Sequence, residues 1–410
     1  MKPFVVFFAV LFFGLVSMLF FLFGTESHTG PVTRVIAEPL LIDVPTEQAL
    51  LEFQDFVQSG IDNGRVPGVA VAVVRGGDII YLKGFGKKEV GHDERIDTHT
   101  LFRLGSVSKS VTSTLAGRLV QEGVIGWDDP VSKYLPDFKL KTQEATDSLR
   151  VKHLISHTTG LPYHAYTNLI EEGYDLGYLI DKLQEVDLVS EAGEFYSYQN
   201  VAYSLLEQLV QAATGKSFDQ LMNEKVFGPL RMSQSSVTYH DFMRNNNAAH
   251  PHLFRGKTWR PVSLSKNYYN VAPAGGINSS ISDMAKWMQA MLGHKTHVIS
   301  KETLDQLYEP RIRATAKNRN FYRWNRIRKS YYGYGWRILQ FNADTLAYHG
   351  GYVNGFRAEV ALNRDEDLGI CVLTNAPGDF SDVAIPTFLT IYDRYLNVQR
   401  KESAANAVAP

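Results

Sequence analysis

Strand-forming runs lie near both ends of this 410-residue chain, and a long stretch with helical periodicity separates them. Runs rich in β-branched and aromatic residues predict strands at 68–74, 79–82, 332–339, 345–352, 356–362 and 368–374. Asn354-Gly355 favours a tight hairpin turn between two of the later strands. We therefore expect an α+β fold, in which one antiparallel sheet is flanked by helices and carries an inserted, mainly helical lobe at about 100–320.

Apolar residues at helical spacing account for most of the middle of the chain. They predict helices at 108–122, 151–156, 176–186, 200–213, 217–227, 281–292 and 301–308. A further helix over 46–63, with Thr46 as its N-cap, precedes the first strand, and an apolar helix over about 380–396 follows the last. A cleft between the sheet and the lobe is the expected place for a site.

The N-terminal segment is strongly apolar, with no charged residue from Phe4 to Gly24. A run of about 20 apolar residues can span a bilayer, so residues 1–24 predict a membrane anchor, with a cleaved signal peptide as the alternative. Residues 25–45 contain several prolines and are interpreted as a linker, and 397–410 as a loose tail. The domain over 46–396 is then expected to be exported, on the periplasmic or extracellular side of the cytoplasmic membrane.

Charge and cysteine content exclude several classes of protein. The net charge is −1, which gives no reason to expect a nucleic-acid partner. Cys371 is the only cysteine, so the chain has neither an intrachain disulfide framework nor a cysteine-based zinc site.

Ser106 and Lys109 lie three residues apart at the predicted start of a helix. This spacing puts both side chains on one helix face, and the helix N-terminus favours a neutral lysine that can act as a base. The alternative is an ordinary helix start, because serine is a good N-cap and lysine a good helix former. Ser263-Leu-Ser-Lys266 repeats the spacing where no helix continues, so the spacing alone decides little.

Tyr198 and Asn200 lie two residues apart in a segment that looks extended, just before a predicted helix. Side chains two apart in an extended chain point the same way, so a phenol that relays a proton and an amide that holds a carbonyl or Lys109 can face one cavity. The alternative is an N-cap asparagine beside a packed tyrosine.

His349-Gly350-Gly351 lies near the end of a predicted strand, just before a hairpin turn. Two glycines in a strand often mark the close approach of another backbone or of a ligand. A substrate along this strand would accept a hydrogen bond from the Tyr352 N–H, and His349 would orient it or transfer a proton. The alternative is a glycine pair beside a surface histidine.

Taken together and in this order, these motifs resemble the class C β-lactamase-like family of active-site serine hydrolases, which also includes D,D-peptidases, D-aminopeptidases and esterases. The resemblance covers roughly residues 50–395. Its segments are Phe102–Lys109, Gly123–Pro136, Val151–Pro162, Tyr198–Asn200, Pro273–Ile277 and His349–Gly351.

The resemblance implies an acyl-enzyme mechanism without metal or other cofactor. Ser106 looks like the nucleophile, Lys109 and Tyr198 look like the groups that move its proton, and Asn200 looks like the residue that positions substrate and lysine. The N–H groups of Ser106 and Tyr352 would form the oxyanion hole, and His349, Gly350 and Gly351 would line the substrate site.

The sequence departs from the family at 349–351, where class C β-lactamases usually carry Lys-Thr-Gly. Histidine is only partly charged near neutral pH and Gly350 has no hydroxyl, so weak binding of a substrate carboxylate is expected unless a cation such as Arg357 reaches in. The expected substrate is a small ester, a β-lactam or a D-amino-acid peptide. The alternative is a non-catalytic peptidoglycan- or ligand-binding protein on the same fold.

Two further features leave alternatives open. His153 and His157 have the i, i+4 spacing of a metal pair but lack the glutamate of H-E-x-x-H. The stretch 311–329 is basic and contains aromatic residues; a solvated loop is the first interpretation, and contact with an anionic membrane or substrate the second.

Overall fold

The computed structural model describes residues 42–315, 321, 324, 327–342 and 344–408, with backbone alone from 397 onward. No helix in this part of the chain is long and apolar enough to cross a membrane. The apolar run from Phe4 to Gly24 and nearly all of the expected linker lie outside it, so the anchor and the export of the domain stay predictions. Residues 316–320, 322–323 and 325–326 of the basic stretch 311–329 also lie outside it.

One eight-stranded antiparallel sheet organises the described chain. Its strand order is β2-β1-β12-β11-β10-β9-β8-β7. The strands are β1 (Gly68–Arg75), β2 (Asp78–Gly86), β7 (Ile312–Arg313), β8 (Lys329–Tyr332), β9 (Arg337–Gln340), β10 (Thr345–Val353), β11 (Phe356–Asn363) and β12 (Leu368–Thr374). Two short pairs lie apart from it: β3 (Leu101–Arg103) with β6 (Asn278–Ser280), and β4 (His252–Arg255) with β5 (Thr258–Pro261).

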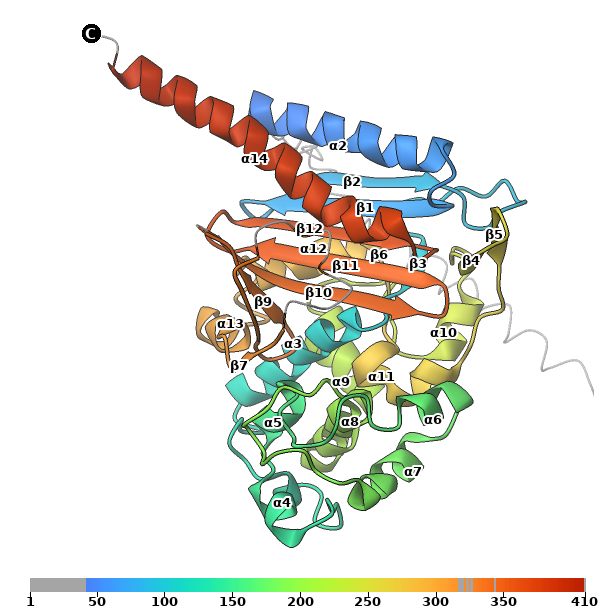
Figure 1. Ribbon diagram of the computed structural model, residues 1–410, viewed down its shortest axis with the longest axis vertical. Coiled ribbons are helices and arrows are strands. Elements are labelled where there is room, and N and C mark those ends of the chain that lie inside the picture. Colours follow the sequence, from blue (N-terminus) through green and yellow to red (C-terminus); the bar gives the residue numbers. More distant parts are fainter. Residues whose placement is uncertain (1–41, 316–320, 322–323, 325–326, 343, 409–410) are drawn as a thin grey trace, which may run out of the picture. The chain divides into compact units, whose positions relative to one another are not determined.

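Strands from the two ends of the described chain lie side by side in the middle of this sheet. β1 pairs with β12 in the register Ala72↔Cys371, and almost every residue of both strands is buried. Such runs of valine, alanine and leucine are typical of a strand covered on both faces. The predicted α+β fold is confirmed (Figure 1).

The strand predicted over 332–339 is wrong as a single element. It contains the last residue of β8, the turn that follows and most of β9, and the two strands form a hairpin. Gly335 has a φ of 77°, a left-handed conformation that suits glycine and reverses the chain. Apolar residues on both sides of the turn concealed this reversal from sequence periodicity.

The helices follow the predicted order with a few short additions. They are α2 (Val44–Asp62), α3 (Val107–Gln121), α4 (Gln143–Ser148), α5 (Val151–Ile155), α6 (Thr167–Glu172), α7 (Leu176–Asp181), α8 (Asn200–Thr214), α9 (Phe218–Met222), α10 (Tyr239–Arg244), α11 (Ala272–Gly275), α12 (Ile281–Met291), α13 (Lys301–Tyr308) and α14 (Asp379–Val408). Short 3-10 or π turns are η1 (Val131–Lys133), η2 (Lys182–Glu185), η3 (Asn223–Phe227) and η4 (Asn267–Val271).

Two helix ends differ from the sequence predictions. The N-cap of α2 is Asp43 rather than Thr46, because the Asp43 carboxylate accepts the Thr46 N–H at 2.9 Å, and the helix therefore begins within the expected linker. The expected loose tail over 397–410 is helical as far as Val408. The residues from Lys401 onward are mostly alanine, lysine and glutamate, which favour helix.

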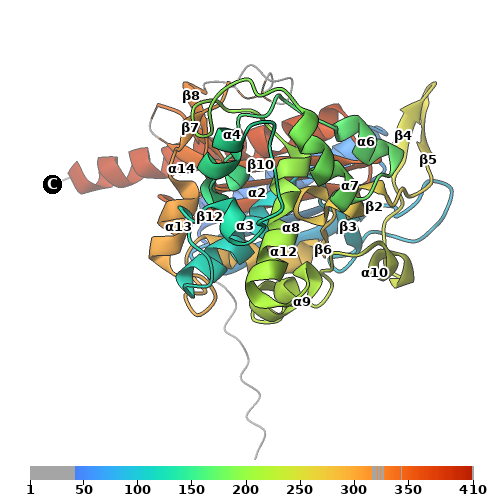
Figure 2. The ribbon, with the colours of Figure 1, turned by 90° about the horizontal axis from the view of Figure 1, so that it is seen from below.

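The sheet lies between two helical layers. Helices α2 and α14 cover one face, where they pack on Val69, Val71 and Val73, while Ala70 and Ala72 face the helices of the insertion (Figure 1). This alternation follows from the period of two along a strand. Turned by 90° and seen from below, the molecule shows the helices of the insertion in front, with α3 and α8 near the middle of the view (Figure 2). Helix α3 carries Ser106 at its start and packs on the sheet at β10.

Candidate active site

Ser106 occupies the turn that opens helix α3. It has the N-cap position, but its side chain makes no capping hydrogen bond, so the interpretation of an ordinary N-cap is not supported. From Leu101 to Ser110 it is the one residue that is not fully buried. Its hydroxyl therefore remains available at the N-terminus of the helix.

Lys109 is completely buried one turn further along α3. Its Nζ donates to the Asn200 Oδ1 at 2.7 Å and to the Ala274 carbonyl at 2.9 Å, and lies 4.5 Å from the centre of the Tyr198 ring. Burial, reinforced by the charge of Arg337, holds the pKa of Lys109 well below 10.5. The lysine is thus prepared to be a neutral amine, which is the form that accepts a proton.

Tyr198, in the extended segment before α8, and Asn200, at the start of that helix, both contact Lys109. Asn200 is the first residue of α8 and Gln199 is its cap, so the Asn200 amide serves Lys109 rather than the helix end. Burial raises the pKa of Tyr198, and its interaction with the Ser106 hydroxyl acts in the opposite direction. The phenol is therefore protonated at neutral pH, and Tyr198 contacts both the serine and the lysine.

Two glycines bring strand β10 against the Ser106 turn. A Cβ on Gly351 would lie 2.0 Å from the Leu104 carbonyl oxygen and 2.8 Å from the Ser106 nitrogen. A Cβ on Gly105, whose φ is 51°, would lie 2.8 Å from the Tyr352 nitrogen. The N–H groups of Ser106 and Tyr352 consequently lie close together, as an oxyanion hole requires.

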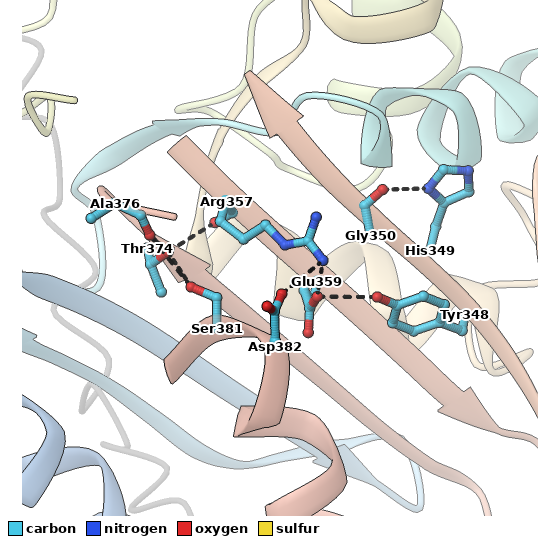
Figure 3. Close-up of polar contacts among 9 residues, drawn as sticks. All are labelled: Tyr348, His349, Gly350, Arg357, Glu359, Thr374, Ala376, Ser381 and Asp382. Atoms are coloured by element: carbon cyan, nitrogen blue, oxygen red, sulfur yellow. Dashed lines mark hydrogen bonds and ion pairs between the residues drawn. The ribbon is translucent and has the colours of Figure 1, made fainter. Parts of the chain in front are cut away.

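His349 is buried and is held as a neutral ring. Its Nδ1 lies 3.0 Å from the Gly350 carbonyl oxygen, which only accepts, so Nδ1 carries the proton (Figure 3). Nε2 then accepts from the Tyr332 hydroxyl at 3.0 Å. Burial, reinforced by Arg337 and Lys109, holds the pKa of His349 well below 6.5. The surface-histidine alternative is wrong, and an imidazolium that binds a carboxylate is not supported either.

Arg357 does not reach the candidate site, so it is not the cation that could offset the weak carboxylate binding expected from the sequence. Tyr348 and His349 project to opposite faces of β10, and Arg357 lies on the Tyr348 side, where it pairs with Glu359 at 2.6 Å and with Asp382 at 3.5 Å (Figure 3). A Cβ on Gly350 would meet the Tyr348 hydroxyl at 2.6 Å. This buried group of charges thus also explains why residue 350 has no side chain.

A groove of about 420 Å³ opens beside Tyr352. Leu253, Val262 and Tyr268 supply apolar surface to it, and Glu171 and Arg255 supply charge of both signs. Because the Tyr352 N–H belongs to the candidate oxyanion hole, the groove offers room for one part of a substrate next to the reacting carbonyl.

The chain is similar to known proteins over most of its length. The beta-lactamase family model matches residues 53–390. This chain belongs to the beta-lactamase family. It is 27% identical over 362 residues to the unguisins hydrolase ungD' of Aspergillus campestris and 23% identical over 339 residues to protein flp of Staphylococcus aureus. These matches cover 85% and 82% of this chain, which spans 65% of the length of each relative.

The fold is also that of a solved structure. The octameric penicillin-binding protein homologue from Pyrococcus abyssi superposes with a TM-score of 0.73 at 24% identity, covering 83% of this chain and 77% of that one. The family resemblance and the fold predicted from sequence are both confirmed.

The structure also shows where three other features of the sequence lie: the segment Pro273–Ile277, the second Ser-x-x-Lys and the possible metal pair of histidines. Pro273–Ile277 supplies the Ala274 carbonyl that holds Lys109. The second Ser-x-x-Lys lies elsewhere: the Ser265 carbonyl accepts from Arg103, and Lys266 is exposed before η4. Each of the two histidines of the possible metal pair has its Nδ1 engaged, His153 with the Arg150 N–H and His157 with the Gln199 N–H.

Arg337 is a site residue that the sequence analysis missed. It lies on β9, is largely buried, and its guanidinium carbon is 5.7 Å from the centre of the Tyr198 ring. Its Nη1 has no hydrogen-bond partner among the described residues. Its sequence signal is weak, since it is one arginine between apolar residues in a short strand. Its positive charge contributes to the low pKa values of Lys109 and His349.

We expect Arg337→Met to move the acid limb of the pH–rate profile to higher pH. A nearby cation disfavours protonated Lys109, so removal of the charge raises the Lys109 pKa, and a given fraction of neutral lysine then requires a higher pH. The measurement is the ester hydrolysis rate from pH 5 to 10. Arg337→Lys keeps the charge and should keep the limb near its wild-type position. An identical limb in Arg337→Met would show that burial alone sets the Lys109 pKa.

Proposed function

We propose that this protein is a serine hydrolase that opens an ester or amide bond through an acyl-enzyme on Ser106. The Ser106 Oγ attacks the carbonyl carbon while its proton passes to the Lys109–Tyr198 pair. That pair then returns a proton to the departing alcohol or amine as the bond breaks. A water molecule hydrolyses the resulting serine ester in the same manner. The oxyanion formed in each half-reaction accepts from the N–H groups of Ser106 and Tyr352.

The observation that carries this proposal is the burial of Lys109 against Tyr198 and Asn200, directly behind Ser106. Burying an amine that is not needed costs several kcal/mol in its charged form, so stability does not explain it. A neutral amine next to a phenol and a half-buried serine is the arrangement that removes a proton from a hydroxyl. Lys109 and Tyr198 share the proton as a coupled pair, so neither residue alone is named as the base.

Two further findings support hydrolysis. The chain belongs to the beta-lactamase family, and a relative at 27% identity is named an unguisins hydrolase. Substrates without a carboxylate beside the reacting bond suit this site best, since His349 is neutral. We therefore rank a small ester above a β-lactam or a peptide with a free C-terminal carboxylate.

A fluorophosphonate probe tests the acylation step directly. The wild-type protein should acquire one phosphonyl group, found on the peptide that contains Ser106, and Ser106→Ala should acquire none. Ser263→Ala, in the second Ser-x-x-Lys, is the matched control and should label like wild type. Failure of the wild type to label would favour the rival function, a binding protein on the same fold.

A substrate panel then separates the branches of the family. We expect a short-chain chromogenic ester to be hydrolysed with a kcat/KM about 10²-fold or more above that of a cephalosporin or a D-Ala-D-Ala peptide, since each of the latter presents a carboxylate to an uncharged histidine. A cephalosporin turned over faster than the ester would contradict this ranking while leaving the acyl-enzyme intact.

A further inference from the structure

His157 lies in the middle of the candidate site, although the mechanism above gives it no task. It follows helix α5 and is completely buried. Its ring centre is 4.3 Å from that of Tyr198 and 4.8 Å from that of Tyr332, the residue that donates to His349. It therefore touches both segments that surround Ser106.

The backbone of His157 has a conformation that normally belongs to glycine. Its φ is 58°, and the Thr158 N–H bonds to the His153 carbonyl at 3.0 Å, the hydrogen bond of a Schellman motif. Helices that end in this way usually place glycine or asparagine at the left-handed position. A histidine there costs about 1 kcal/mol or more of backbone strain, so we expect its side chain to make an interaction that glycine or asparagine would not make as well.

His157 forms hydrogen bonds, through both its side chain and its backbone, to the segment that carries Tyr198. The Gln199 N–H donates to the His157 Nδ1 at 3.2 Å, and the Ser197 N–H donates to the His157 carbonyl at 2.8 Å. Tyr198 lies between these two contacts, and its own carbonyl accepts the His164 N–H at 2.9 Å. Two backbone–backbone hydrogen bonds and one to the His157 ring thus fix three consecutive residues, 197–199.

The contact with Gln199 also fixes the state of the ring. A backbone N–H only donates, so Nδ1 must be bare and the single proton lies on Nε2. Nε2 is buried with no hydrogen-bond partner among the described residues, which a purely structural histidine would avoid. A protonated ring would turn Nδ1 into a donor that faces another donor and would release Gln199.

We propose that His157 is a positioning residue: as a neutral hydrogen-bond acceptor for the Gln199 N–H, it holds the Tyr198 phenol in line between Ser106 and Lys109. This inference rests on the proposed function for its effect on rate, but its geometric part stands independently. It also gives a physical role to His157 in the His-Thr-Thr-Gly segment, which the sequence analysis associated with the family resemblance and with a possible metal pair.

Three substitutions separate the acceptor from the backbone conformation. His157→Gly adopts a φ of 58° without strain but has no acceptor. His157→Asn tolerates the same φ and places its Oδ1 close to the position of Nδ1. His157→Ala lacks the acceptor and is also strained. His164→Ala is the control for loss of a neighbouring ring, because the His164 ring centre lies 5.5 Å from that of Tyr198 while the hydrogen bond to the Tyr198 carbonyl comes from the His164 backbone N–H, which alanine keeps.

We expect kcat for the ester to fall about 10²-fold in His157→Gly with KM nearly unchanged, because misplacing a catalytic group by about an ångström costs that much. His157→Asn should recover to within about five-fold of wild type. Equal rates in the glycine and asparagine variants, both folded by circular dichroism, would overturn the proposal. So would a glycine variant as fast as wild type.

Hydrogen–deuterium exchange gives a readout that does not depend on activity. Peptides spanning 196–203 should exchange faster in His157→Gly and near the wild-type rate in His157→Asn. If wild type fails to label with the fluorophosphonate yet this exchange pattern appears, the positioning contact holds and the proposed function fails. If wild type labels but exchange is the same in all variants, the positioning inference fails and the function stands.

Discussion

Lys109→Met should lower the rate of acylation by about 10³-fold while leaving the protein at least as stable as wild type near neutral pH. Methionine fills a similar volume but cannot accept a proton, and general base catalysis is worth about 10²–10⁴-fold. Part of the decrease in rate also comes from Asn200, because its side-chain amide loses the hydrogen bond from the Lys109 amine that fixes its position. Pre-steady-state kinetics with an activated ester measures acylation separately from deacylation.

The stability of this variant provides an independent check on the state of Lys109. In wild type the folded pKa lies well below 10.5, so between the two values the unfolded chain binds a proton that the folded chain does not. Wild-type stability should therefore gain a contribution that rises with pH through this window, and Lys109→Met should lose that slope. Urea unfolding from pH 7 to 9 measures it.

Lys266→Met is the matched control, since it removes the lysine of the second Ser-x-x-Lys from an exposed position. It should alter neither rate nor pH slope. A Lys109→Met protein that acylates at the wild-type rate would remove the lysine from the mechanism and leave Tyr198 as the only base among the residues placed here.

Gly351→Ala should lower kcat by about 10²–10³-fold, the cost of losing one oxyanion donor. Its Cβ would lie 2.0 Å from the Leu104 carbonyl oxygen and 2.8 Å from the Val107 nitrogen, both of them backbone atoms that cannot rotate away. Strand β10 must therefore withdraw from the Ser106 turn, and the Tyr352 N–H moves with it. Steady-state kinetics with the ester measures the loss of kcat. Thermal unfolding measures the loss of stability, which we expect to be about 1–3 kcal/mol.

Gly177→Ala is the corresponding control, because it adds the same methyl group within helix α7, where the nearest atom is the Asp175 Oδ1 at 3.2 Å. A shift of a few tenths of an ångström accommodates it, and alanine favours helix. Full activity in Gly351→Ala would mean that β10 does not deliver an oxyanion donor, whatever the measured stability.

Much of the fold could be predicted because it depends on short-range pattern. The continuous apolar run of β1 and the Asn354-Gly355 turn are local signals, and the structure has a buried strand and a hairpin turn at these positions. The prediction failed where two local signals merged, at the hairpin of β8 and β9, whose turn is hidden among aromatic residues. It also failed at the end of α14, where composition was interpreted without its helix propensity.

In the candidate site, too, some residues could be predicted from the sequence and others could not. Ser106 and Lys109 are three residues apart on one helix, so their proximity follows from sequence alone. Arg337 was missed because its position depends on which strand lies beside β10 and on which face it points, and neither is a local property. The sequence left open whether Arg357 reaches the site, and the structure decides against it, because the period of two along β11 turns Arg357 to the opposite face, with Glu359.

The sequence by itself determined the family, the sheet with its helical insertion and the segments that carry the candidate chemistry, because each is written in local periodicity or in residues close along the chain. Only the tertiary structure decided the ionisation of the site. Lys109 and His349 have low pKa values because the fold buries them near Arg337, and His157 has its task because the fold places it against Tyr198. Desolvation and charge act through space, so residues far apart in the sequence determine them together.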